Sequence, residues 1–437
     1  MSRARLTALA SSGAALIVLT ALGLMVQWQG NLHRFLAVAG LQAAAYLVAV
    51  WSVWNGGSSR RLVFGIAAIA AVMRGAILCA PPYLSSDVYR YVWDGRVAAA
   101  GINPYRYIPA DPHLTPLRDT AIFPQINRRN YAPTIYPPAA EAIFLAVTRV
   151  SGSVTAMKAA MVGFEMIAFV LLVRLLAAEG LPAGRVVVYA WHPLPLWEFA
   201  GSGHIDAALV ALTVAALWAR RRGRGRLAGL FLAGATLTKF YPAVLLPALY
   251  RRRDWRMPGV FAAALVIGYL PFIGAGWHVF GFLPGYAGEE GFDRGGAGFY
   301  LLGLLRDLPP FAGLPALAYA AGAAAILAAL GAAIAVRRDI PPPSLAAAAI
   351  LATVFMVLLS PHYAWYFAWL IVFACFIRSF ALLWLTNACL LLYLIPVGSS
   401  IVRNDYRVAL ESLIYGPFAA LALVDLWYHR RRPGRSR

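Results

Sequence analysis

Residues 7–26 read TALASSGAALIVLTALGLMV, a run without a single charged side chain. A helix needs about 20 apolar residues to cross the hydrocarbon core of a bilayer. Backbone groups in lipid must be hydrogen-bonded within their own segment, so a run of this kind forms a helix. The stretch therefore predicts a membrane-spanning helix near the start of the chain.

Comparable apolar runs recur along the whole chain, with shorter or interrupted ones between them. Together they predict an all-α, polytopic integral membrane protein of roughly 11 to 14 transmembrane helices, forming a single transmembrane domain over residues 1–437. The other full-length runs are 35–54, 62–80, 155–177, 258–273, 311–336, 344–360, 363–377, 380–396 and 411–428. The shorter runs are 137–150, 186–200 and 204–219, and a longer run with two prolines is 227–250.

The overall composition agrees with a membrane protein. Of the 437 residues, 61% are hydrophobic and only 13% are charged. Soluble proteins carry about a quarter charged residues, so this composition excludes a disordered chain, a coiled coil and an ordinary soluble domain. The net charge of +20 allows two interpretations, a polyanionic partner or membrane topology, and the placement of the basic residues decides between them.

The arginines gather in clusters between the apolar runs, and the positive-inside rule places such clusters in the cytoplasm. We therefore expect a multi-pass protein of the inner (plasma) membrane with cytoplasmic N- and C-termini and loop 81–136 on the external, periplasmic face. The charge then reflects topology and attraction to anionic lipids, with no nucleic acid partner. Between 136 and 250 the crossings do not match a simple count of runs, which predicts an interfacial, re-entrant or half-helical run there. The clusters are Arg3 and Arg5, Arg60 and Arg61, the arginines of 220–226, 251–253 and 430–432, and Arg337 and Arg338.

The external loop 81–136 is dense in polar and aromatic residues. Asp87 and Asp94 are seven residues apart, which is two helical turns, so a helix would place both on one face with Arg90 and Tyr91 between them. Two interpretations stay open for Asp87. It caps a juxtamembrane helix beside an interfacial aromatic belt, or it acts as a general base for an acceptor hydroxyl at the membrane boundary.

Ionisable residues within apolar runs are costly, so they are candidates for function. Lys239 is one of only two lysines in the chain, and its ammonium suits a phosphate oxygen of a lipid carrier. The alternative is a lysine that snorkels to the interface. Glu141 and Glu165 also lie in apolar runs, and we expect Arg149 or Lys158 to pair with one of them.

Two histidines lie near other polar residues. His204 and Asp206 follow a Gly-Ser-Gly turn and either contact a substrate or belong to an ordinary helix start. His362 lies between two apolar runs and serves as a proton carrier or phosphate donor, or as a polar turn residue in an aromatic belt. The external segment 289–294 is a solvated charged turn or a loop that closes over substrate, and segment 404–407 carries no motif.

Several short motifs follow one another in a defined order. They are Asp87-Val-Tyr-Arg-Tyr-Val-Trp-Asp94-Gly95, Gly101-Ile-Asn-Pro-Tyr105, Tyr136-Pro-Pro, Gly203-His-Ile-Asp206, Lys239-Phe-Tyr-Pro242 and Ser360-Pro-His-Tyr363. This order resembles the C-type glycosyltransferase superfamily, and it is most similar to the polyprenol-phosphate-mannose-dependent mannosyltransferases of glycosyltransferase family 87. The chain departs from the simplest family pattern in having three apolar runs before the large loop, where many members have one.

The resemblance implies an enzyme that transfers a sugar, expected to be mannose, from a polyprenyl-phosphate donor to an acceptor hydroxyl with inversion on the external face. The general base of the family maps to Asp87, within a catalytic loop at 81–136. The expected partners are the polyprenyl-phosphate sugar, membrane lipids and a lipid or glycan acceptor. We expect no cofactor and no divalent metal, because a monophosphate donor does not demand one. The expected substrate-binding residues are Arg90, Tyr91, Asp94, Tyr136, His204, Asp206, Lys239 and His362.

Two other classes of protein fit parts of the sequence. A secondary transporter or lipid-linked sugar flippase also has broken apolar runs and charge at membrane depth, but it would arrange its charges around a two-sided pathway. A structural or signalling membrane protein predicts no convergence of Asp87, Lys239, His204 and His362. The positions of these four side chains therefore discriminate among the three classes.

Overall fold

A computed structural model describes residues 2–56, 59–289, 299–337, 343–395 and 405–431. These residues form helices and connecting segments, with no β-strand among them. One hydrophobic core cluster includes buried side chains from Leu9 in the first helix to Tyr415 in the last. The predicted all-α architecture is confirmed.

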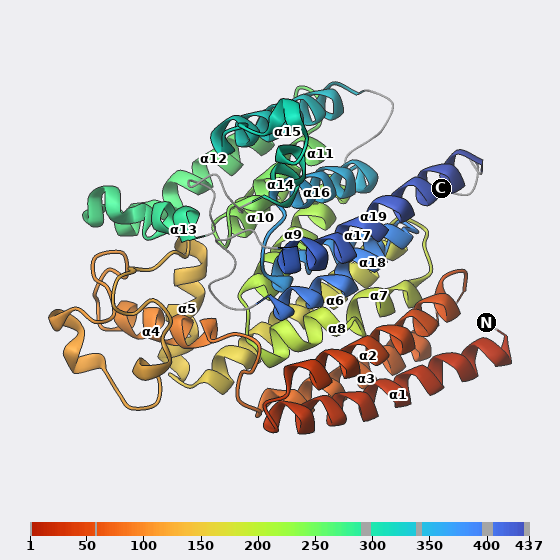
Figure 1. The fold of residues 1–437 in the computed structure, drawn as a ribbon, viewed down its shortest axis with the longest axis horizontal. Helices are drawn as coiled ribbons and strands as arrows, with labels where there is room; N and C mark the ends of the chain where they lie inside the picture. The colour runs from red at the N-terminus through yellow and green to blue at the C-terminus, as the bar shows by residue number, and fades with distance from the viewer. Residues whose placement is uncertain (1, 57–58, 290–298, 338–342, 396–404, 432–437) are drawn as a thin grey trace.

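The three N-terminal helices pack side by side at one edge of the molecule (Figure 1). They are α1 (Arg3–Trp28), α2 (Leu32–Val53) and α3 (Arg60–Leu78). Ser2, Asn31 and Ser59 cap their N-termini by accepting a backbone N–H three residues later. Gly30 adopts a positive φ of 67° between α1 and α2, which lets the chain reverse direction there.

The loop after α3 is folded and lies away from both chain termini (Figure 1). It contains α4 (Asp87–Ala99) and the 3₁₀ turns η1 (Pro112–Leu117) and η2 (Phe123–Gln125), and α5 (Pro138–Val150) follows it. Helices α4 and α5 pack closely, and Gly95 makes this possible because a Cβ there would lie 2.4 Å from the Phe144 carbonyl oxygen. The loop is thus a rigid platform for Asp87.

The middle of the chain contains one continuous long helix and a broken segment. The elements are α6 (Val154–Ala178), η3 (Ala183–Val186), α7 (Val187–Ala190), α8 (Pro193–Pro195), the π-helical turn η4 (Leu196–Gly201), α9 (Asp206–Arg221), α10 (Gly225–Thr236), η5 (Tyr241–Leu245) and α11 (Leu246–Leu249). Run 186–200 is therefore not one helix, because Pro193 and Pro195 lack the N–H groups that would continue it. All of its residues are buried.

The C-terminal half covers the top of the molecule in Figure 1 and returns toward the N-terminal helices. Its elements are α12 (Arg256–Tyr269), η6 (Leu270–Phe280), α13 (Leu283–Glu289), α14 (Tyr300–Arg306), η7 (Pro309–Phe311), α15 (Ala316–Val336), α16 (Leu345–Leu359), η8 (Ala364–Phe367), α17 (Leu370–Ala374), α18 (Phe380–Ala388), η9 (Cys389–Leu394) and α19 (Asp405–Arg431).

Seven helical segments of the described chain are long and apolar enough to cross a membrane. They correspond to α1, α2, α3, α6, the continuous segment Arg256–Glu289, α15 and most of α19, and three shorter apolar segments follow α15. The protein is thus a polytopic membrane protein, as predicted. The number of crossings, roughly 11 to 14, stays a prediction.

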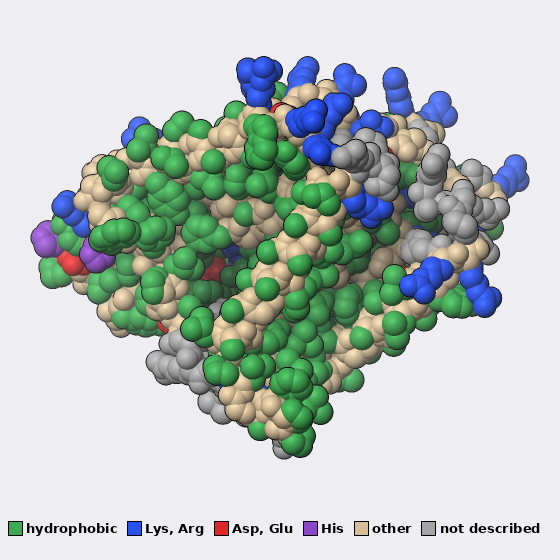
Figure 2. Space-filling view, turned by 90° about the horizontal axis from the view of Figure 1, so that it is seen from above, with side chains coloured by type: hydrophobic (Ala, Val, Ile, Leu, Met, Phe, Trp, Pro, Cys, Tyr) green, Lys and Arg blue, Asp and Glu red, His purple; other side chains and the backbone are tan. Residues whose placement is uncertain are grey.

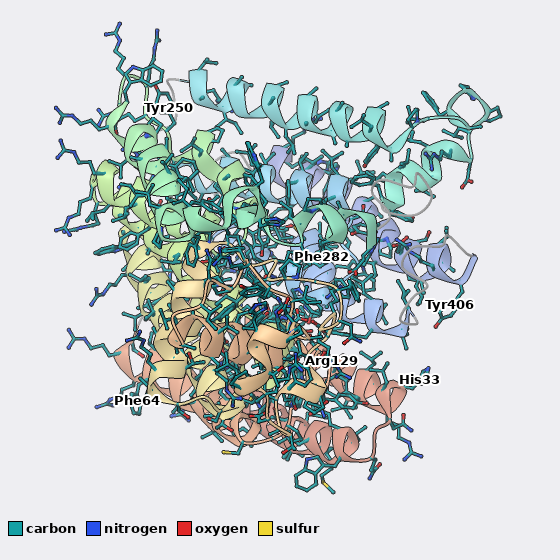
Figure 3. The ribbon with its side chains drawn as sticks, turned by 90° about the vertical axis from the view of Figure 1, so that its left-hand side faces the viewer. His33, Phe64, Arg129, Tyr250, Phe282 and Tyr406 are labelled. Carbon is teal, nitrogen blue, oxygen red and sulfur yellow. The ribbon has the colours of Figure 1, made fainter. Side chains whose placement is uncertain are left out.

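The basic side chains gather on one side of the molecule. Figure 2 shows most of them along two adjoining edges, at the top and the right. In Figure 3, Phe64, which follows Arg60 and Arg61, lies on the same side as Tyr250, which precedes Arg251. His33 and Tyr406 lie on the opposite side (Figure 3). The positive-inside rule makes the arginine-rich side the expected cytoplasmic side.

The predicted partners of the buried glutamates are wrong. Glu165 Oε1 accepts hydrogen bonds from Arg74 Nε and Nη2, at 3.0 and 2.5 Å, because α3 packs against α6. Lys158 Nζ instead donates to the carbonyl oxygens of Ile77 and Ala80. Glu141 accepts a hydrogen bond of 2.6 Å from the Thr134 hydroxyl.

Candidate active site

A cavity of about 980 Å³ lies between the loop 81–136 and the helices of the C-terminal half. We call it the Asp87 cavity. Its polar and aromatic lining residues include Asp87, Asn127, Arg128, Tyr131, Tyr136, Lys239, Tyr241, Tyr286, Glu289, His362, Tyr363, Trp365, Tyr366, Tyr393 and Arg407. Apolar side chains from α13, α15 and α16 line another part, among them Leu283, Leu327, Phe355 and Leu359. The cavity can therefore hold a ligand with a polar head and an apolar chain.

Asp87 is the first residue of α4, where the helix dipole favours a negative charge. Its backbone N–H donates to Ser85 Oγ at 3.2 Å. The carboxylate accepts a hydrogen bond of 2.6 Å from Asn127 Nδ2 on one oxygen and of 3.4 Å from the Tyr136 hydroxyl on the other. With 17% of its side chain exposed, Asp87 is held in a fixed orientation at the cavity wall.

Tyr136 donates one of the two hydrogen bonds that orient this carboxylate. Burial raises the pKa of Tyr136 well above its ordinary value, and the charge of Asp87 raises it further. The phenol consequently remains a neutral hydrogen-bond donor to Asp87. Its ring packs edge-on against Tyr91 at 4.9 Å between ring centroids, which fixes the hydroxyl in place.

His204 lies behind Asp87 and does not line the cavity. Its Nδ1 is 4.0 Å from Asp87 Oδ2 and its Nε2 is 3.5 Å from Glu198 Oε2, and the residue is fully buried. The Trp365 ring stacks on the imidazole at 4.0 Å and separates it from the cavity. His204 was predicted to contact substrate, but it lies behind the Asp87 carboxylate, where it supports that side chain.

Gly203 makes this close approach possible. It has a φ of 77°, and a Cβ there would lie 2.9 Å from Val88 Cγ2. The Gly-Ser-Gly turn thus brings His204 against α4, which is the physical reason that His204 does not line the cavity.

Lys239 lines the cavity, and 11% of its side chain is exposed. Its Nζ is 2.7 Å from Asp206 Oδ2 and lies 4.4 Å from the centroid of the Tyr366 ring. Asp206 is buried and also accepts a hydrogen bond of 3.0 Å from the Tyr241 hydroxyl. Asp206 therefore positions Lys239 and does not itself line the cavity.

His362 and Arg407 form a second cationic group in the wall. Arg407 Nη2 is 2.5 Å from His362 Nε2, and the guanidinium also donates to Glu411 Oε1 at 3.1 Å. All three side chains are buried. Sequence analysis found His362 but missed Arg407, because the segment around it has no motif and the two residues are 45 positions apart.

The outer rim joins the loop 81–136 to α13. Arg128 Nε donates to Glu289 Oε2 at 2.6 Å, and the Tyr131 hydroxyl donates to Glu289 Oε1 at 2.8 Å. Burial alone would lower the pKa of Arg128, but the hydrogen bond and charge of Glu289 outweigh it and raise the pKa above its usual value. Glu289 is thus part of a closed rim, while residues 290–294 of the predicted charged turn lie outside the described residues.

Three predicted substrate-binding residues of α4 do not line the cavity. Arg90 Nε donates to both carboxylate oxygens of Asp94, at 2.7 and 2.9 Å, and its Nη1 donates to the Ala132 carbonyl oxygen. Tyr91 is buried and stacks on Phe144 at 4.6 Å. Arg90 and Asp94 pair with each other inside the loop and stabilise its fold. They were predicted to bind substrate, but the structure places them away from the cavity.

Asp87 and Lys239 meet at one cavity with His362, and His204 lies directly behind. Such convergence contradicts a purely structural role. Among the described residues, no group of three or more His, Cys, Asp or Glu side chains is placed to hold a metal ion. The fold and the cavity define a polytopic membrane protein in which a carboxylate and cations face a space that is part polar and part apolar.

Comparison with known families identifies the family within this class. Residues 4–251 match the family model described as alpha-(1->6)-mannopyranosyltransferase, N-terminal domain, and the chain belongs to this family. It is thus a membrane mannosyltransferase, although the finer resemblance to glycosyltransferase family 87 is not confirmed. No curated protein matches the chain. The matched region includes Asp87, Tyr136 and Lys239, while His362 and Arg407 lie beyond it.

Proposed function

We propose that this enzyme transfers mannose from a polyprenyl-phosphate donor to an acceptor hydroxyl, on the external face of the membrane, with inversion at the anomeric carbon. The observation that carries the proposal is the placement of the Asp87 carboxylate in one cavity with Lys239 and with the Arg407–His362 pair. The family description names α(1→6) transfer, and we propose the same linkage here, with the C6 hydroxyl of a mannose as acceptor.

In the proposed reaction, Asp87 accepts the proton of the acceptor hydroxyl as that oxygen attacks the anomeric carbon of the donor. The new C–O bond forms on the face opposite the phosphate, and the bond to the phosphate oxygen breaks with its electron pair. Attack from the opposite face converts a β-linked donor into an α-linked product. A single displacement needs no second carboxylate as nucleophile.

The leaving phosphate gains negative charge in this step, so fixed cations accelerate it. We assign Lys239 to the phosphate, because Asp206 and the Tyr366 ring hold its ammonium at the cavity wall. The apolar residues Leu327 and Phe355 of the same cavity accommodate the start of the prenyl chain. The protein thus supplies a base, a positioned cation and an oriented donor.

A transporter or flippase is less well supported. A second cavity, of about 1110 Å³, opens at the arginine-rich side and is lined by Arg220, Arg251, Arg252, Arg253 and Arg256 among others. We call it the arginine cavity. It shares no lining residue with the Asp87 cavity. A two-sided pathway would join these spaces, so the separation favours an enzyme.

The test is transfer of labelled mannose from polyprenyl-phosphate mannose by membrane vesicles. We expect Asp87→Asn to lower the rate at least about a thousandfold, because removal of a general base and of its charge act together. Asp111→Asn is the matched control, since Asp111 belongs to the same loop and does not line the cavity. Size-exclusion profiles confirm folding of both variants.

Two results would overturn the proposal. Full activity of Asp87→Asn would remove Asp87 as the base. A product that resists an α-specific mannosidase would contradict inversion of a β-linked donor.

A further inference from the structure

The arginine cavity shares no lining residue with the proposed active site. The end of α9, the segment between α11 and α12, the C-terminal half of α15 and the start of α16 form its walls. Tyr250, one of its lining residues, lies on the side where the basic side chains project (Figure 3). The cavity therefore opens at the expected cytoplasmic surface of the bilayer.

Its lining is strongly cationic. Seven of the lining residues are arginines, and Asp254 is the one acidic residue among them. Arg251, Arg252 and Arg253 are exposed side by side at the mouth. Positive charges at this density attract an anion, and the membrane surface beside them carries anionic lipids.

Arg220 shows that the cavity needs a further acceptor. Only 4% of its side chain is exposed, and Nη1 donates to Asp254 Oδ2 at 2.6 Å. Its Nε and Nη2 are buried and have no hydrogen-bond partner among the described residues. A buried guanidinium with unsatisfied donors is costly, and planar groups of this kind bind phosphate oxygens well.

The opposite wall combines a helix N-terminus with an apolar surface. Ser344, the N-cap of α16, lines the cavity together with Ala346 and Ala347 of the first turn, and a helix N-terminus favours anions. Leu330 and Ile334 of α15 and Ile350 of α16 continue the wall, and Ile350 is half exposed. A polar head group at the arginines would thus have apolar surface beside it for an acyl chain.

We propose that the arginine cavity binds the phosphate of an anionic phospholipid from the leaflet on the arginine-rich side, with an acyl chain along α15 and α16. The positive-inside rule accounts for the side on which these arginines lie. It does not account for their arrangement around a concave site, for the unsatisfied nitrogens of Arg220 or for the helix N-terminus opposite them. The site recognises a phosphate beside an apolar chain.

The test compares lipid binding by the full chain in detergent, measured by native mass spectrometry with phosphatidylglycerol or phosphatidylcholine. We expect the wild-type protein to retain phosphatidylglycerol about tenfold or more tightly than phosphatidylcholine. The triple variant Arg251→Gln, Arg252→Gln, Arg253→Gln is expected to lose this preference. The matched control is Arg222→Gln, Arg224→Gln, Arg226→Gln, which removes the same charge outside the cavity and should keep the preference.

A third measurement adds inorganic phosphate, to determine whether the ligand is a lipid or a free phosphate. The proposal is overturned if both triple variants lose phosphatidylglycerol equally, or if the wild-type protein retains phosphatidylcholine as tightly. It is also overturned if inorganic phosphate raises the Tm while phosphatidylglycerol does not, since the ligand would then be soluble. None of these measurements uses mannosyl transfer, so their outcome is independent of the proposed reaction.

Discussion

The Asp87 cavity and the arginine cavity are similar in size but handle charge in opposite ways. In the first, the ionisable side chains are paired: Lys239 with Asp206 and Arg128 with Glu289 on other elements, and Arg407 with Glu411 on its own helix and with His362. In the second, seven arginines and one carboxylate line the cavity; Arg220 pairs with that carboxylate, Asp254, and Arg221 pairs with Glu179 outside the lining. The first cavity fixes its charges, and the second keeps an excess of one sign.

This difference indicates two kinds of function. A transferase needs a few groups held at fixed positions against a changing charge, because pre-organisation lowers the barrier. A site for an anionic lipid head group needs electrostatic attraction, but its cations need not be held at exact positions. Removal of one charged side chain should therefore lower the transfer rate of the Asp87 cavity strongly, whereas lipid binding by the arginine cavity should weaken gradually as arginines are removed.

Lys239→Gln should give the largest effect after Asp87→Asn. Removal of the cation beside the leaving phosphate is expected to lower kcat/KM about a hundredfold, equivalent to about 3 kcal/mol. Initial rates with polyprenyl-phosphate mannose measure it. Arg226→Gln, which removes an exposed cation outside both cavities, is the control and should leave the rate unchanged. Equal rates for Lys239→Gln and wild type would show that fixed charge at this wall has no catalytic role.

The case of Lys239 also shows what sequence can reveal. A lysine in an apolar run of an arginine-rich chain is conspicuous by composition alone, as is Asp87 in a long polar loop. By contrast, Arg128 and Glu289 are 161 positions apart and Arg74 and Glu165 are 91 apart, so only the folded chain brings them together. Arg90 and Asp94 shared the expected helix face, but their spacing of four also suits mutual pairing, which is what the structure contains.

The fold, too, could be predicted only in part from the sequence. Hydropathy predicts the long helices α1, α2, α3 and α6, because each must satisfy its backbone within itself. Segment 183–201 also contains many apolar residues, yet it breaks into four short pieces that are buried against other helices. Neighbouring protein supplies the packing that makes this broken backbone tolerable, and the sequence of the segment does not contain that information.

Arg407→Gln is expected to have a smaller effect, with a loss of about tenfold in kcat/KM. The change removes the charge next to His362, while Lys239 remains to face the phosphate. Arg407→Lys should recover part of the activity, since a structural defect would affect both variants alike. Transfer rates together with size-exclusion profiles check this. If neither variant changes the rate, then the wall beyond residue 251 does not contribute to the reaction.

The smallest effect is expected at the rim, where the Arg128–Glu289 pair is 26% exposed on each side. Exposed ion pairs contribute about 0–1 kcal/mol, so Arg128→Gln should raise KM a few fold and leave kcat unchanged. Because the pKa of Arg128 is raised, its charge persists as the pH rises from neutral to moderately alkaline values, and the KM ratio between variant and wild type should stay constant over that range. Glu289→Gln should behave alike, and the double variant should be no worse than either single one, since both remove the same contact. An additive double variant, or a fall in kcat, would place these residues among the fixed charges of the reaction and weaken the distinction between the inner wall of the cavity and its rim.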